Sequence, residues 1–130
     1  MSIAIHPSMP GVLLVEGDPE AQSALVRAIA ESGARVVGAG SGEAAIALFD
    51  AWPTGLVVVN GELPGIDGLE VARRIHASSP DVPIVLMSAR KQDERYALAA
   101  RLAGVFATLA MPFDHDLLLD VVRSLVPQLA

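Results

Sequence analysis

Short apolar runs alternate with stretches of helical periodicity along the whole chain, and this alternation constrains the fold more than any other feature. Runs such as VLLV and LVVV have no polar face, which is typical of strands buried on both sides. They occupy residues 12–15, 35–39, 56–59, 83–87 and 105–110. Strands that alternate with single helices pair in parallel and carry helices on both faces of the sheet. The sequence therefore predicts an α/β fold with a doubly wound, five-stranded parallel sheet and five helices.

Cap residues mark where the helices begin and end. Aspartate followed by proline is a strong helix start, so Asp18-Pro19 opens the first helix, and Gly33 closes it. Ser41 caps the second helix, which stops before Trp52-Pro53 because the residue before a proline avoids helical geometry. The other helices are expected from residue 69 to the 78–80 stretch, from about 92 to 103, and over 117–126 after an Asp114 cap.

Composition fits one folded domain that acts inside the cell. Of the 130 residues, 52% are hydrophobic and only 18% are charged, which is typical of a chain with a sizeable core. Residues 1–10 are expected to form a flexible tail and residues 11–130 the domain. No apolar run is long enough for a membrane span, the first residues lack the basic region of a secretory signal, and cysteine is absent. We therefore expect a cytoplasmic protein.

The charge of the chain argues against two classes of partner. Nine cationic side chains face fifteen anionic ones, so the net charge is −6. An acidic protein is repelled by phosphate backbones and by anionic lipid surfaces. We therefore expect that the domain binds neither nucleic acid nor membranes.

Four motifs at the predicted strand ends are similar to a known family. In chain order they read VLLVEGDP, LVVVNGELPGIDGLEV, PIVLMSAR and AGVFATLAMPF, and the loop LPGIDGLE is the most specific of them. In sequence and spacing, residues 12–129 resemble the CheY-like receiver domain of two-component response regulators. The resemblance implies a flavodoxin-like, receiver-type fold, with the functional residues at the carboxyl ends of the strands.

The resemblance also implies a phosphorylation chemistry, against which this sequence can be compared. In receivers an acidic pair after the first strand binds Mg²⁺, and an aspartate that ends the third strand accepts the phosphoryl group. A Ser or Thr ends the fourth strand, a lysine follows the fifth, and an aromatic residue within the fifth strand moves as the switch. The matching positions here are Glu16, Gly17 and Asp18, then Asn60 at the phosphoacceptor position, Ser88, Thr108 at the aromatic position, and Met111 at the lysine position.

Only Ser88 keeps the residue type that this chemistry needs. The amide of Asn60 is a poor nucleophile because its lone pair is delocalised into the carbonyl group. Mg²⁺ prefers several carboxylate oxygens, and Glu16 beside a neutral amide supplies few. Met111 has no charge to stabilise phosphoryl transfer, and Thr108 is too small to act as a moving aromatic side chain. The interpretation is a degenerate pseudo-receiver that is not an enzyme, has no cofactor and binds Mg²⁺ weakly or not at all.

A pseudo-receiver would act in signal transduction by binding a protein independently of phosphate. The expected partner is a histidine kinase, another signalling protein or a second copy of the chain. Family members commonly use the face formed by the last two helices and the strand between them. The apolar positions of the last helix also span half of its circumference or more, which is wider than an ordinary surface helix needs. The predicted contact residues are Ala97, Arg101, Thr108, Leu117 and Val121.

The buried stripe of the last helix is expected to consist of four residues at helical spacing. These are Leu118, Val122, Leu125 and Leu129. Leu117 and Val121 would flank one edge of the stripe, and Leu119 and Val126 the other.

Two other functions stay open from the sequence. One is a conventional phosphorelay receiver with altered residues, and the other is a small-molecule module that uses the emptied phosphorylation pocket. No output domain follows residue 130 in the sequence, so a single-domain signalling module is expected.

Further local features have plain structural interpretations. A cation could lie among Glu16, Asp18 and Glu62, although a solvated acidic rim explains them as well. Asn60-Gly61 has the sequence that favours deamidation, unless the folded loop holds the amide away from attack. The histidines share no metal-ligand spacing and are expected at the surface, and the glycines of residues 38–42 form a tight turn rather than a dinucleotide loop.

Overall fold

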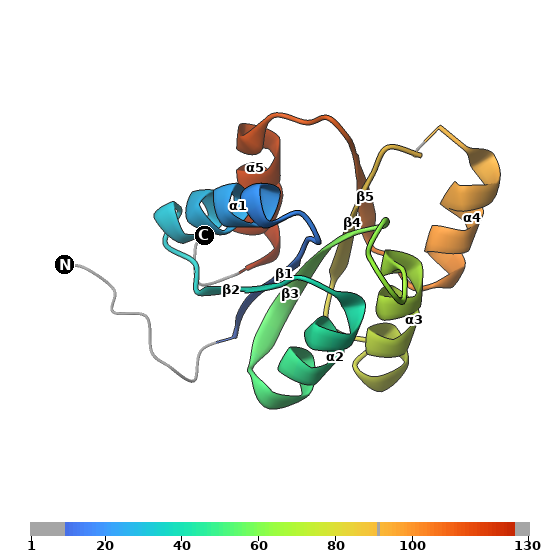
Figure 1. The fold of residues 1–130 in the computed structure, drawn as a ribbon, viewed down its shortest axis with the longest axis horizontal. Coiled ribbons are helices and arrows are strands. Elements are labelled where there is room, and N and C mark those ends of the chain that lie inside the picture. The colour runs from blue at the N-terminus through green and yellow to red at the C-terminus, as the bar shows by residue number, and fades with distance from the viewer. Residues whose placement is uncertain (1–9, 91, 127–130) are drawn as a thin grey trace.

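The computed structural model describes residues 10–90 and 92–126. Five strands alternate with five helices, and the strands form one parallel sheet in the order β2-β1-β3-β4-β5 (Figure 1). The predicted fold class is confirmed. The predicted tail lies outside the described residues except for Pro10. The strands are β1 (Gly11–Val15), β2 (Val36–Ala39), β3 (Thr54–Asn60), β4 (Ile84–Ser88) and β5 (Ala107–Ala110), and the helices are α1 (Pro19–Glu31), α2 (Gly42–Ala51), α3 (Gly68–Ser78), α4 (Glu94–Leu102) and α5 (His115–Leu125).

The sheet separates two apolar cores. Helices α2, α3 and α4 cover one face, and α1 and α5 cover the other (Figure 1). Alternate residues of each central strand enter opposite cores, as Leu13 and Leu14 of β1 do, and both are fully buried. Burial on both faces explains why the central strands are continuous apolar runs. Among the described residues, none of the helices is both long and apolar enough to cross a bilayer.

The predicted caps Asp18, Ser41 and Asp114 are confirmed, and the caps of α3 and α4 were missed. The Asp18 carboxylate accepts a hydrogen bond from the Ala21 N–H at 2.8 Å, and Ser41 accepts one from the Ala44 N–H at 3.1 Å. Asp67 and Asp93 cap α3 and α4 in the same way. The prediction that the fourth helix begins near residue 92 was therefore early, because the cap itself has extended geometry and the helix starts after it.

The buried stripe of α5 differs from the predicted one. Leu118, Val122 and Val126 are buried, whereas Leu125 is only half-buried and residue 129 lies outside the described part. The helix ends at Leu125, and Val126 has the extended backbone of a C-cap. Its side chain enters the core four residues after Val122, so the buried stripe consists of Leu118, Val122 and Val126.

The loop after β3 returns to its own start through a close backbone contact. The Gly68 N–H donates to the Gly61 carbonyl oxygen at 2.9 Å. A Cβ atom at Gly68 would overlap the Asn60 carbonyl oxygen and lie 2.7 Å from the Gly61 Cα. These neighbours are backbone atoms and cannot rotate away, so α3 can begin here only with glycine.

We predict that Gly68→Ala destabilises the protein by about 1–3 kcal/mol, the range for overpacking a tight site. Gly40→Ala is the matched control, because a Cβ there would meet only the Gln22 side chain at 3.5 Å. Urea unfolding measures both variants. Equal stability of the two would show that the loop relaxes freely around residue 68.

Candidate functional site

The carboxyl ends of the central strands meet at one edge of the sheet and carry the candidate site. Glu16 follows β1, Asn60 ends β3, Ser88 ends β4, and Met111 follows β5. In an open parallel sheet this edge is where ligands bind and reactions take place.

A carboxylate and an amide form the centre of this edge. The Asn60 Nδ2 donates to both carboxylate oxygens of Glu16, at 3.0 and 3.2 Å. The Asn60 Oδ1 accepts a hydrogen bond from the Glu62 N–H at 2.9 Å, and the Asp18 N–H donates to Glu16 at 3.2 Å. Glu16 is only 7% exposed. Both ends of the Asn60 amide are thus engaged, and the buried carboxylate receives donors from two directions.

This pairing determines what the centre can do chemically. The nitrogen lone pair of the Asn60 amide is delocalised into its carbonyl group, and its N–H faces the Glu16 carboxylate, so this side chain is a poor nucleophile. The hydrogen bonds at both ends of Asn60 also hold its side chain in one orientation. This fixed orientation favours the alternative in which the folded loop holds the amide of Asn60-Gly61 away from attack and so slows its deamidation.

The residues at this edge do not fit Mg²⁺, the ion that receivers bind. Asp18 is exposed, and its carboxylate caps α1. Glu16 is already engaged by Asn60, and Gly17 has no side chain. A Cβ atom at Gly17 would lie 2.9 Å from the Pro64 Cδ, so the loop leaves no room for a second acid. Among the described residues, no three His, Cys, Asp or Glu side chains gather as metal ligands.

Ser88 is buried at the end of β4 beside a tyrosine that the sequence analysis missed. The Ser88 Oγ accepts a hydrogen bond from the Arg90 N–H at 2.8 Å. Tyr96 comes from α4, is 8% exposed, and places its hydroxyl against Gly61, where a Cβ atom would overlap it. The Arg90 guanidinium lies 4.4 Å from the centroid of the Tyr96 ring. An aromatic side chain therefore reaches the site from a helix, although the expected aromatic position on β5 is Thr108.

The environment of Tyr96 favours its neutral phenol. Burial raises the pKa of Tyr96, while a hydrogen bond with the Ser88 side chain and the nearby charge of Arg90 oppose that rise. The net shift is upward, because removal of the phenol from water disfavours the tyrosinate anion.

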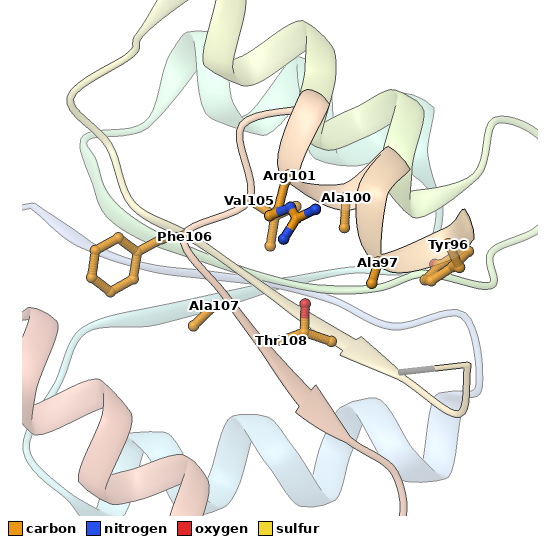
Figure 2. Close-up of a pocket in the computed structure, with 8 residues that line it drawn as sticks. All are labelled: Tyr96, Ala97, Ala100, Arg101, Val105, Phe106, Ala107 and Thr108. Atoms are coloured by element: carbon orange, nitrogen blue, oxygen red, sulfur yellow. The ribbon is translucent and has the colours of Figure 1, made fainter. Parts of the chain in front are cut away.

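A groove of about 380 Å³ separates α4 from β5 and contains three of the five predicted contact residues. Figure 2 shows Thr108 pointing from β5 toward α4, with Ala97 and Arg101 on the helix above it. Phe106 lies at the other end of the groove from Tyr96 and is 65% exposed (Figure 2). The groove therefore combines one threonine hydroxyl, one exposed arginine and an exposed aromatic ring.

The remaining two predicted contact residues lie outside this groove. Leu117, at the start of α5, is 47% exposed, whereas Val121 is half-buried against the core between the sheet and α1 and α5. Neither lines the groove. The two sets are separate because α4 and α5 cover opposite faces of the sheet (Figure 1).

The remaining predicted surface residues have varied surroundings. Glu62 is exposed, and His115 is exposed at the start of α5. His76 is half-buried, and its ring packs against Gly104, which has a positive φ of 89°. His6 lies outside the described residues.

Comparisons with known proteins agree on one family. The model of the response regulator receiver domain matches residues 12–123. The C4-dicarboxylate transport transcriptional regulatory protein DctD of Pseudomonas aeruginosa is 34% identical over 113 residues, which are 86% of this chain and 24% of that protein. The transcriptional regulatory protein AfsQ1 of Streptomyces coelicolor is 41% identical over 85 residues, 65% of this chain and 37% of that protein. The chain thus spans well under half the length of these two relatives.

Solved structures extend the match to the fold. A CheY-like receiver domain protein from Methanospirillum hungatei aligns with a TM-score of 0.86 and 17% identity, over 94% of this chain and 97% of that one. The Francisella response regulator 1452 receiver domain aligns with a TM-score of 0.83 and 21% identity, over 93% and 99%. At these identities the likeness concerns the fold alone.

Tyr96 is the only tyrosine in the sequence, so its titration can be followed directly by ultraviolet absorbance. We predict that tyrosinate forms at higher pH in the folded protein than in urea, where the pKa is about 10. Because the folded pKa is raised, the stabilisation is complete below the unfolded pKa and is lost as the pH rises through the folded value. When the pH is raised above ~10, the free energy of unfolding should therefore fall less for Tyr96→Phe than for the parent. Coincident titrations in the folded and unfolded states would contradict this.

Proposed function

The chain belongs to the receiver domain family of two-component response regulators, and from this membership we propose that it is a pseudo-receiver. It keeps the family's scaffold and works in signal transduction without becoming phosphorylated. The proposed unit comprises residues 11–130, acts in the cytoplasm, and contacts other proteins through the groove between α4 and β5.

The Glu16–Asn60 pair is the observation that carries this proposal. In the family the side chain at the end of the third strand attacks a phosphoryl donor, and by resemblance Asn60 is that residue. Here it is a neutral amide that donates two hydrogen bonds to a buried carboxylate. A phosphoryl group at this point would meet that carboxylate without Mg²⁺ or a lysine to offset the repulsion. The Glu16–Asn60 pair is therefore suited to holding the strand ends together and not to accepting a phosphoryl group.

The groove between α4 and β5 is the surface that fits a protein partner. Arg101 is exposed, and none of the ion pairs between described residues includes it. Phe106, which lines the same groove, adds a large exposed apolar side chain. Exposed aromatic and arginine side chains are typical of residues that dominate protein interfaces. The fitting partner is a segment with an apolar anchor and an acidic group, from a histidine kinase, another signalling protein or a second copy of the chain.

A conventional phosphorelay receiver is the second candidate. Ser88 supports it, because a hydroxyl remains buried at the end of β4, and Glu16 supports it as one surviving acid. This candidate needs a phosphoryl acceptor other than Asn60 and a site for Mg²⁺. Labelling by acetyl phosphate tests the first, and stabilisation by Mg²⁺ tests the second.

We predict that the protein remains unmodified when it is incubated with Mg²⁺ and acetyl phosphate, as measured by intact mass. Asn60→Asp should stay unlabelled as well, because Gly17 and Met111 still lack the second acid and the cation. Mg²⁺ alone should leave the melting temperature of the parent unchanged. Stoichiometric labelling of either form would sink the pseudo-receiver proposal in favour of the second candidate.

For the groove, we predict that Phe106→Asp combined with Arg101→Glu weakens association about tenfold or more, the effect of losing interface hot spots. Sedimentation velocity measures self-association, and pull-down from the native host measures other partners. Leu117→Asp combined with Arg27→Glu is the matched control, because it changes the charge equally at exposed residues outside the groove. Circular dichroism checks that both variants fold. A folded double variant with every interaction of the parent would show that the groove is not the interface.

A further inference from the structure

A second pocket lies on the other face of the sheet, close to the Glu16–Asn60 pair. It has a volume of about 390 Å³ and opens between α1 and the loop that joins β5 to α5. Volumes of about 300–1,000 Å³ are typical of sites for small molecules. Most of its wall is apolar: Leu25 from α1, Met87 from β4, and Met111 and Phe113 from the loop after β5.

Only two ionisable side chains line this pocket, and one of them is a buried carboxylate. His115 is exposed at the rim, whereas Glu16 is buried. The donors to the Glu16 carboxylate are the Asn60 amide and the Asp18 N–H, both of which are neutral. None of the ion pairs between described residues includes Glu16. A buried anion that is hydrogen-bonded but not paired with a cation is stabilised further when a cation enters its surroundings.

The rest of the wall determines which kind of cation fits. Thioether and aromatic groups, as in Met87, Met111 and Phe113, are polarisable and attract organic cations, but they do not replace the water shell of a hard metal ion. Anionic molecules are repelled by Glu16. We propose that this pocket is a binding site for a small organic cation, an ammonium group on an apolar ring or chain, with the ammonium at Glu16 and the apolar part against Met87, Met111 and Phe113. This site is separate from the groove between α4 and β5, so the partner proposal can fail while this one holds, and the reverse.

The test uses 2-phenylethylammonium as the probe and 2-phenylethanol as its neutral counterpart. The methyl groups of Met87 and Met111 report binding directly by NMR, at a pH of about 8, where an ordinary histidine is neutral. We expect saturable shifts of both methyl signals with the ammonium probe and at least about tenfold weaker binding of the alcohol, the effect of losing a charge-assisted hydrogen bond. The methyl signals of Leu102, which is on α4, should stay unchanged.

Two pairs of variants separate charge from shape. Glu16→Gln should lower the affinity for the ammonium probe about tenfold and leave the affinity for the alcohol unchanged. Glu43→Gln is the control for a general loss of negative charge. Met111→Lys places an ammonium inside the pocket, so it should raise the melting temperature and abolish probe binding. Met111→Leu conserves volume without charge and should retain binding.

Three results would overturn the site. These are the absence of saturable shifts in the folded parent, equal affinity for the ammonium and the alcohol, and equal loss of binding in Met111→Lys and Met111→Leu. If Glu16→Gln does not fold by circular dichroism, the Met111 pair still decides, because Met111 is only half-buried.

Discussion

A buried carboxylate needs hydrogen-bond donors, and this requirement sets the character of the whole strand-end edge. Glu16 receives two hydrogen bonds from Asn60 and one from the Asp18 N–H. An aspartate at position 60 would instead place two negative charges about 3 Å apart, which neither group tolerates without a cation. The amide at the end of β3 and the acid after β1 therefore depend on each other. Gly17 completes the arrangement, since the loop around Pro64 closes over it.

The strand ends around the Glu16–Asn60 pair border both the groove between α4 and β5 and the second pocket. Toward α4, Tyr96 packs its hydroxyl against Gly61 and hydrogen-bonds Ser88, so the wall of the α4–β5 groove touches the strand ends directly. Toward α1, Glu16 forms part of the wall of the apolar pocket. Each face of the sheet thus has its own recess, and both recesses reach the same row of strand ends.

The fold could be predicted from local signals, whereas the site could not be predicted in full. Continuous apolar runs and the caps at Asp18 and Ser41 are properties of short stretches of chain, and the structure confirms them. The role of Tyr96 depends on contacts between α4 and the ends of β3 and β4, which no spacing in the sequence reveals. The available signal was the helical spacing of Tyr96 with Ala100 and Ala103 after the Asp93 cap, which indicates that its ring is buried. The placement of Val126 failed for another reason: Leu125 and Val126 are both apolar and both lie at helical spacing from Val122 or Leu118, so spacing alone could not choose between them.

Exchanging the carboxylate and the amide between positions 16 and 60 shows whether these two side chains depend on each other. The free energy of unfolding is measured by urea titration for Glu16→Gln, Asn60→Asp and the double variant at neutral and acidic pH. We expect Asn60→Asp to be destabilised at neutral pH and to recover at acidic pH as one carboxyl becomes protonated, because a carboxyl whose pKa is raised in the folded state lowers the stability of the protein as the pH rises. The double variant restores one acid and one amide, so it should regain most of the loss, with a coupling energy of about 1–3 kcal/mol. An Asn60→Asp variant as stable as the parent at neutral pH, or a double variant equal to the sum of the single ones, would contradict the account.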